Sequence, residues 1–103
     1  EWPRIRFDII IDDGLHTPDA NAKTLHNLFP LLKKNGSFYV EDVWPLDIMT
    51  TKEMQHWWVQ KYPERYNILA MNKFTKEIEG KDVKRFDLRA KSGQPDSYII
   101  RVK

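Results

Sequence analysis

The stretch FDIIIDDGLHTPDANAKTLHNLFPLLKKNGSFYVEDV, residues 7–43, decides the fold of this chain. A strand is expected over 6–13, because the run of three isoleucines at 9–11 is β-branched and uninterrupted. A strand that is apolar on both faces is typical of a parallel sheet covered by helices on each side. A second strand is expected over 37–42, and it ends, like the first, in two carboxylates.

A helix is expected between these two strands. Thr17 is a typical N-cap, and Pro18 suits the first helical position. Apolar residues then recur at helical spacing and form one stripe, made of Leu25, Leu28, Phe29 and Leu32. Pro30 interrupts the pattern, so we expect a kink or a restarted turn there. The two lysines at 33–34 and Gly36 are typical of the cationic last turn and the stop of a helix.

The second half of the chain is expected to continue the alternation of helices and strands. A helix is expected over 51–62 and a third strand over 66–71, followed by a polar, solvated connection over 72–84. A short strand at 86–88 and a final strand at 98–102 flank a turn-rich cluster, which predicts a hairpin. This order predicts an α/β fold with an open, mostly parallel sheet, a C-terminal antiparallel hairpin and helices on both faces.

Composition and charge argue against several classes of function. The chain has 103 residues, 41% of them hydrophobic and 31% charged, which is typical of one globular domain or part of one. Its formal net charge of +2 is too small and too evenly spread to indicate a nucleic-acid partner. There is no cysteine, so only oxygen or imidazole could hold a metal. Apolar runs are short and no signal peptide is visible, so we expect a cytoplasmic protein with no membrane partner.

Carboxylates follow both of the first two strands. Open α/β sheets place their ligand sites at the carboxyl ends of the strands, which here carry acidic pairs: Asp12 with Asp13, and Glu41 with Asp42. Parallel neighbouring strands lie about 4.8 Å apart, so up to four carboxylates would share one small volume. Like charges at that spacing need compensation, and a hard, oxygen-bound divalent cation such as Mg²⁺ supplies it.

His16 lies on the loop between the first strand and the helix. An imidazole can accept a proton near neutral pH, so beside a metal that acidifies a substrate hydroxyl it suits the role of general base. The alternative stays open at this point. Asp13-Gly14 is also an ordinary turn sequence, and an isolated histidine before a helix is more often a surface or capping residue.

Residues 7–43 resemble the central segment of one branch of the class I S-adenosylmethionine-dependent methyltransferases. That branch includes macrolide-sugar O-methyltransferases of the mycinamicin and tylosin type, cephalosporin-hydroxylase-like proteins and rhamnosyl O-methyltransferases. Its pattern is a strand ending in Asp-Asp-Gly-Ser-His, a helix ending in Leu-Phe-Pro-Leu-Leu-Lys, a glycine turn and a strand ending in Glu-Asp. This chain has DDGLH, LFPLLK, Gly36 and ED in the same order, and its tail FDLRAKSGQPDSYIIRVK is more loosely similar.

The resemblance implies a role for each acidic strand end. Asp13, Glu41 and Asp42 match the family's metal-binding carboxylates, and His16 matches its catalytic base. Asp12 would lie at the edge of the cofactor. The implied activity is metal-assisted O-methyl transfer from S-adenosylmethionine to the hydroxyl of a sugar-like small molecule. The implied fold is a partial Rossmann-like methyltransferase sheet.

Two departures from the family pattern matter. Leu15 stands where the family usually has Ser, and the four glycines of the chain are isolated, so no glycine-rich turn is present for the cofactor. We therefore expect residues 1–103 to form a single domain that is the C-terminal half of a methyltransferase domain. The cofactor-binding half would belong to a longer parent, and the fragment alone would be inactive.

Three tryptophans lie close together in the sequence: Trp44, Trp57 and Trp58. They could form an aromatic wall for a sugar or, more simply, pack an outer helix against the core. Trp44 directly follows the second acidic strand end, so it is the best candidate for contact with the substrate.

Two other classes of function stay open. Half of such a sheet exposes a strand edge, so the chain could be a non-catalytic, truncated methyltransferase-like module that forms a homodimer through that edge. A metal-dependent hydrolase is a weaker alternative, because the sequence supplies neither a second metal set nor a nucleophile motif.

Overall fold

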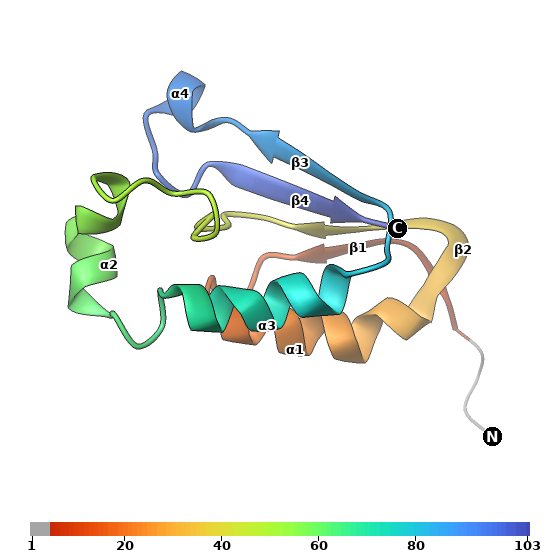
Figure 1. Ribbon diagram of the computed structural model, residues 1–103. Coiled ribbons are helices and arrows are strands. Elements are labelled where there is room, and N and C mark those ends of the chain that lie inside the picture. The colour runs from red at the N-terminus through yellow and green to blue at the C-terminus, as the bar shows by residue number, and fades with distance from the viewer. Residues whose placement is uncertain (1–4) are drawn as a thin grey trace.

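The computed structural model describes residues 5–103, which form a four-stranded sheet in the order β1-β2-β4-β3. The strands are β1 (Phe7–Asp12), β2 (Leu32–Val40), β3 (Val83–Asp87) and β4 (Tyr98–Val102). β1 and β2 are parallel, whereas β4 is antiparallel to both β2 and β3. Three strands therefore share one direction, with β4 running against them between β2 and β3 (Figure 1). The expected α/β class, the parallel first pair and the C-terminal antiparallel pair are found. The sheet is mixed and not mostly parallel, because two of its three strand pairings are antiparallel.

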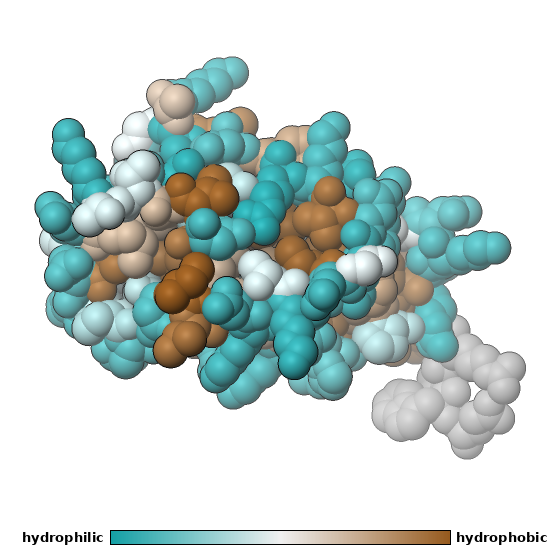
Figure 2. Space-filling model, in the orientation of Figure 1, coloured by the Kyte–Doolittle hydropathy of each residue, from teal (hydrophilic) through white to brown (hydrophobic). Residues whose placement is uncertain are grey.

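Two long helices cover one face of the sheet. α1 (Pro18–Leu28) and α3 (Ile68–Ile78) lie side by side along it (Figure 1). Their outer surface is mostly hydrophilic, with separate apolar patches (Figure 2). Within residues 5–103 no helix covers the opposite face, so the expectation of helices on both faces is not met in the described part. On that face Ile9 and Ile11 are 59% and 57% exposed.

The core lies between the sheet and this helical layer. In the strand register, Phe38 pairs with Val102 and Val40 with Ile100, and all four side chains are fully buried. They belong to one cluster with residues of α1 and α3: Leu25, Met71 and Phe74. Burying an aliphatic or aromatic side chain of this size contributes about 1.5–3 kcal/mol, so this layer is the main source of stability.

α1 begins as predicted and ends earlier than predicted. The Thr17 hydroxyl accepts a hydrogen bond from the Ala20 amide at 3.3 Å. Pro30 lies in a short 3₁₀ turn, η1 (Phe29–Leu31), and the chain is already extended at Leu32. The lysines at 33–34 therefore belong to β2 and not to the end of the helix, which corrects the sequence interpretation.

Gly36 also lies inside β2, where it serves strand pairing and does not stop a helix. A Cβ at this position would lie 2.8 Å from the Asp8 carbonyl oxygen of β1. The register between β1 and β2 shifts at the same level, between Phe7 and Ile9. Only glycine allows the two backbones to approach so closely there.

The prediction of a third strand over 66–71 and a polar connection over 72–84 is wrong. These residues contribute α3 and the start of β3. Asn67 caps the helix, accepting a hydrogen bond from the Ala70 amide at 2.9 Å. Met71, Phe74 and Ile78 are buried at helical spacing, so burial of this face outweighs the strand-like apolar run that precedes it.

The helix expected over 51–62 is interrupted. The structure has a 3₁₀ turn, η2 (Glu53–Gln55), and a short helix, α2 (Trp57–Lys61), separated by His56. His56 is extended, with ψ at 138°, and its Nδ1 accepts a hydrogen bond from the Trp58 amide at 3.2 Å. A further short helix, α4 (Arg89–Ser92), lies between β3 and β4. Among residues 5–103, no helix is long and apolar enough to cross a bilayer.

Candidate metal centre

The carboxyl ends of β1 and β2 lie side by side, as the sequence predicted. Asp12 pairs with Val40 at the last level of the parallel register. The Glu41 amide then donates to the Asp12 carbonyl at 3.1 Å, which keeps the two chains together just beyond the sheet. The loops that leave the strands, 13–17 and 41–43, therefore start from one place.

Three side chains converge between these loops: Asp13, His16 and Asp42. The Nε2 atom of His16 lies 3.8 Å from Oδ1 of Asp13 and 3.7 Å from Oδ2 of Asp42. One ligand atom from each of the three residues lies within 4.8 Å of the others. The two carboxylates are 61% and 52% exposed and the imidazole 34%, so the cluster is open to solvent on one side.

The backbone at Asp42 directs its carboxylate into this cluster. Asp42 has a φ of 52°, and it is the one non-glycine residue of the described chain with positive φ. An L residue other than glycine rarely adopts this left-handed conformation, although Asp and Asn tolerate it best. The chain bends at Asp42, two residues after β2, and the Asp42 carboxylate lies on the same side of His16 as that of Asp13.

His16 has one ring nitrogen toward the carboxylates and the other toward the protein. Its Nδ1 is buried, with no hydrogen-bond partner among residues 5–103. Leaving a buried polar atom without a hydrogen bond destabilises the fold by about 1–3 kcal/mol. Local hydrogen bonding alone therefore does not explain why the His16 ring is oriented with Nδ1 toward the protein. The other ring nitrogen, Nε2, faces Asp13 and Asp42.

Asp12 takes a structural position next to the cluster. It is 6% exposed, and its two carboxylate oxygens accept hydrogen bonds from the Asn21 side chain at 3.0 Å and the Gly14 amide at 3.2 Å. These bonds tie the 13–17 loop to α1. Contact between Asp12 and a cofactor stays a prediction.

Glu41 is not part of the three-residue cluster that the described chain forms. Its backbone joins the two strand ends, while its side chain supplies no ligand atom within the shared 4.8 Å volume. Its assignment as a metal ligand therefore also stays a prediction.

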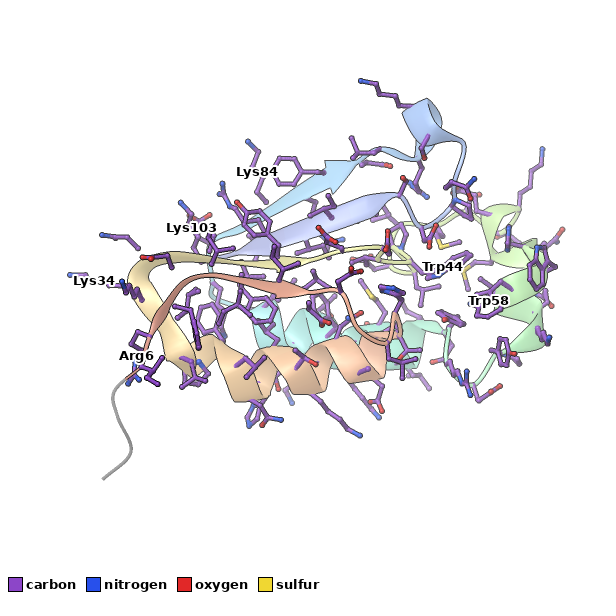
Figure 3. All side chains as sticks on the ribbon, turned by 180° about the vertical axis from the view of Figure 1, so that it is seen from behind. Arg6, Lys34, Trp44, Trp58, Lys84 and Lys103 are labelled. Carbon is purple, nitrogen blue, oxygen red and sulfur yellow. The ribbon has the colours of Figure 1, made fainter. Side chains whose placement is uncertain are left out.

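An aromatic cavity of about 380 Å³ opens beside His16. Its apolar and aromatic lining comes from the 13–17 loop, from the segment after β2 and from the region of α2, namely Leu15, Trp44, Trp57, Trp58 and Tyr66. Trp44 is 7% exposed and packs against His56 and Tyr66, with ring centroids 5.3 and 5.6 Å apart. Trp44 and Trp58 lie together at the α2 end of the molecule (Figure 3).

Sequence reasoning missed several residues of this cavity. Arg65 lies between α2 and α3, and Gln94 and Asp96 belong to the loop before β4. The Ser-Gly-Gln-Pro-Asp cluster at 92–96 indicated a turn, but nothing in the sequence placed that turn beside the first acidic strand end.

A second acidic cluster lies at the end of β3. Arg89 donates to both oxygens of Asp87 and to Glu53, each at 2.9 Å. The hydrogen bonds from Arg89 lower the pKa of Asp87 below its ordinary value. The pKa of Glu53 is lowered first by the backbone hydrogen bond from Thr50, with a smaller contribution from Arg89. In this cluster the guanidinium of Arg89 neutralises the carboxylates.

Comparison with known proteins relates part of the chain to O-methyltransferases. Over 38 residues it is 42% identical to a demethylmacrocin O-methyltransferase of Streptomyces fradiae. Over a stretch of the same length it is 40% identical to an 8-demethyl-8-(2-methoxy-alpha-L-rhamnosyl)-tetracenomycin-C 3'-O-methyltransferase of Streptomyces olivaceus. Each match covers 37% of this chain and 10% of the relative. No protein-family profile matches the chain, and no solved structure is significantly similar to it.

Proposed function

We propose that this chain forms the hydroxyl-activating part of a metal-assisted O-methyltransferase that acts on a sugar-like small molecule. The observation that carries the proposal is the convergence of Asp13, His16 and Asp42 within 4.8 Å at adjacent parallel strand ends. Partial similarity to two O-methyltransferases supports methyl transfer in general.

The residues present fit a hard divalent cation. Asp13 and Asp42 offer two carboxylates, and within the described residues neither forms an ion pair with lysine or arginine. Mg²⁺ is commonly held by one or two carboxylates, with waters and substrate oxygens in the remaining positions, which suits a cluster that is half open to solvent. A cation bound there would lower the pKa of a substrate hydroxyl.

His16 supplies the proton acceptor in this proposal. In the proposed step the hydroxyl O–H bond would break, its proton would go to Nε2, and the oxygen would attack the sulfonium methyl of S-adenosylmethionine with the electron pair that it keeps. The S–CH₃ bond would break at the same time, and its electron pair would stay on sulfur, so that S-adenosylhomocysteine leaves. Nε2 faces Asp13 and Asp42, so it lies next to the place where a hydroxyl on the cation would be. Glu41 at the adjoining strand end would complete the metal set if its side chain turned inward.

In this proposal the site for the methyl donor is formed by residues outside this chain. S-adenosylmethionine needs a tight glycine-rich turn after a strand, and Gly14, Gly36, Gly80 and Gly93 are isolated. Asp12, which the resemblance places at the cofactor's edge, already uses both oxygens within the chain. The proposal therefore assigns donor binding to a longer parent protein.

A non-catalytic module is the second candidate, and the edge strand favours it. β1 ends the sheet, and its side chains Phe7, Ile9 and Ile11 are 45%, 59% and 57% exposed. An apolar edge of this kind can pair with a second copy. Light scattering coupled to size-exclusion chromatography would show a dimer that Ile9→Lys converts to a monomer. A wild-type monomer rules out this candidate.

The metal proposal is tested by locating Mn²⁺ on the ¹⁵N-labelled chain by NMR. Paramagnetic broadening should be strongest for the amides of 13–17 and 41–43 and clearly weaker around Asp87 and Arg89. Competition with Mg²⁺ should restore the signals. Broadening centred anywhere else, or none at all, overturns the assignment of Asp13 and Asp42 as ligands.

A further inference from the structure

Asn21 is a buried polar residue of α1 that is not part of the metal cluster. It is 4% exposed, and its side-chain amide donates a hydrogen bond to Oδ2 of Asp12 at 3.0 Å. Asp12 is 6% exposed, and the donors to its carboxylate within residues 5–103 are neutral N–H groups, not a lysine or arginine. A buried carboxylate is unfavourable unless hydrogen bonds satisfy it, so the orientation of Asp12 depends on Asn21.

Asp12 in turn links the three segments that meet at the site. Its Oδ2 is bonded to α1, and its Oδ1 accepts from the Gly14 amide of the 13–17 loop at 3.2 Å. Its carbonyl oxygen accepts from the Glu41 amide, beyond the end of β2, at 3.1 Å. Gly14 and Glu41 are the immediate chain neighbours of the two candidate carboxylate ligands. The way Asp12 is held therefore affects where both ligands leave the sheet.

The first turn of α1 also holds the other end of the 13–17 loop. The Thr17 amide donates to the Leu15 carbonyl at 3.0 Å, which closes a γ-turn centred on His16. Thr17 is buried, and its carbonyl accepts from the Asn21 amide at 2.9 Å. Asn21 thus bonds to both ends of the loop, through its side chain to Asp12 and through its backbone to Thr17.

We propose that Asn21 is a positioning residue of the metal centre. By holding Asp12 it fixes the 13–17 loop, so that Asp13 and His16 face Asp42 before an ion arrives. The inference rests on the proposed function for the presence of the ion, and goes beyond it by making metal affinity depend on a side chain that touches no ligand atom. Ligands that are already in place lose less conformational freedom on binding, so a looser loop binds the ion more weakly.

The first test compares Mn²⁺ affinities by isothermal titration, well below the unfolding temperature of each variant. Asn21→Ala should weaken binding about tenfold, a typical effect of losing a hydrogen bond that orients a metal ligand. Ile78→Val is the control for a general loss of stability, because it removes one methyl group from a side chain that is 7% exposed. Ile78 ends α3 shortly before β3 begins, so it lies at the end of the sheet opposite the site, and its variant should keep wild-type affinity.

A reciprocal exchange tests whether the hydrogen bond itself is responsible. In the double variant Asp12→Asn/Asn21→Asp, the amide at position 12 can donate to the carboxylate at position 21, and its oxygen can still accept from Gly14. Asn21→Asp alone places two carboxylates face to face, and Asp12→Asn alone places two amides there. The double variant should therefore bind Mn²⁺ more tightly than either single variant. Affinity no better than that of the single variants contradicts the role of this bond.

The exchange of the Gly14 amide with water gives a readout that needs no ion. Measured by NMR in EDTA, it should become roughly fivefold faster in Asn21→Ala, as expected for the loss of one hydrogen bond, and slow again in the double variant. If the wild-type chain binds Mn²⁺ at the site, faster exchange with unchanged affinity, or the reverse, overturns the inference. If the wild-type chain binds no Mn²⁺ there, the proposed function fails by itself, and unchanged Gly14 exchange in Asn21→Ala would show that Asn21 does not hold the loop either.

Discussion

Two acidic clusters lie at the same end of this sheet, beyond the carboxyl ends of its parallel strands. They differ in whether a cationic side chain of the protein pairs with the carboxylates. β3 runs parallel to β1 and β2, so Asp87 ends its strand where Asp13 and Asp42 follow theirs. Asp87 and Glu53 are bridged by Arg89, which is itself only 17% exposed. Among residues 5–103, Asp13 and Asp42 have only His16 as a potential cation between them, at distances too long for hydrogen bonds.

The difference shows that a carboxylate pair is a candidate ligand set only where the fold leaves it without a cation of its own. Arg89 uses the oxygens of Asp87 in a bidentate bond, which leaves a foreign ion little to coordinate. At the other cluster no lysine or arginine of residues 5–103 pairs with the carboxylates, which are 61% and 52% exposed. The sequence shows acidic residues at the strand ends in both places. What distinguishes a structural cluster from a candidate metal site is therefore whether an arginine or lysine pairs with the carboxylates.

The largest expected effect is on metal affinity. Asp13→Asn or Asp42→Asn should weaken Mg²⁺ or Mn²⁺ binding roughly 100-fold, equivalent to about 2.8 kcal/mol, because each removes an anionic ligand. Isothermal titration measures this. Asp87→Asn is the matched control and should leave the affinity unchanged. Equal losses in all three variants would abolish the distinction between the two clusters.

The second prediction concerns the buried carboxylate that supports the open cluster. Asn21→Ala removes the side-chain donor to Asp12 and leaves a buried oxygen unsatisfied. The free energy of unfolding should fall by about 1–3 kcal/mol. Urea unfolding followed by circular dichroism measures it, with Asn27→Ala on the exposed face of α1 as control. A loss no larger than that of the control would show that solvent satisfies Asp12.

The third prediction concerns the pH dependence of the Arg89 cluster. Asp87 and Glu53 have pKa values below their ordinary 3.8 and 4.5, so they stabilise the fold at neutral pH and lose this contribution as the pH falls through the lowered values. Arg89→Gln should reduce stability near pH 7, and the difference from wild type should shrink below about pH 4. Thermal unfolding at several pH values measures it. A difference that is constant with pH would mean that Arg89 acts through packing.

The smallest expected effect separates a base from a ligand. If His16 accepts a proton and does not bind the ion, His16→Gln should change metal affinity by no more than about threefold, a difference under 1 kcal/mol. Titration of the variant beside Asp13→Asn measures it. A loss as large as that of Asp13→Asn would make His16 the third ligand and leave the base unassigned.

The fold could be predicted where the local sequence pattern fits only one type of secondary structure. The isoleucine run of β1 and the Thr17 cap of α1 each have one physical reading in the sequence, and both are found. The segment at 66–71 has two readings, because a short apolar run suits a strand or a buried helix face equally. This segment is helical because Met71 and Phe74 pack against α1 and the sheet. That tertiary contact cannot be inferred from the local sequence.

The sequence predicted that the two acidic strand ends lie side by side. It did not predict which carboxylates converge there or the cavity beside them. Successive residues of an extended chain point to opposite sides, so Glu41 and Asp42 could not both be aimed at Asp13 by the strand alone. The choice of Asp42 depends on its positive φ. The cavity beside His16 combines residues of three distant segments, whose juxtaposition follows from tertiary packing.

The left-handed backbone at Asp42 lowers thermal stability at a position that we propose as a metal ligand. Glycine would adopt a φ of 52° without the steric cost, of about 1–2 kcal/mol, that a β-carbon brings. Laboratory evolution for heat resistance alone would therefore tend to put glycine at position 42 and discard the carboxylate. Persistence of aspartate there under such pressure would indicate that the conformation is maintained for what it presents, at the expense of melting temperature.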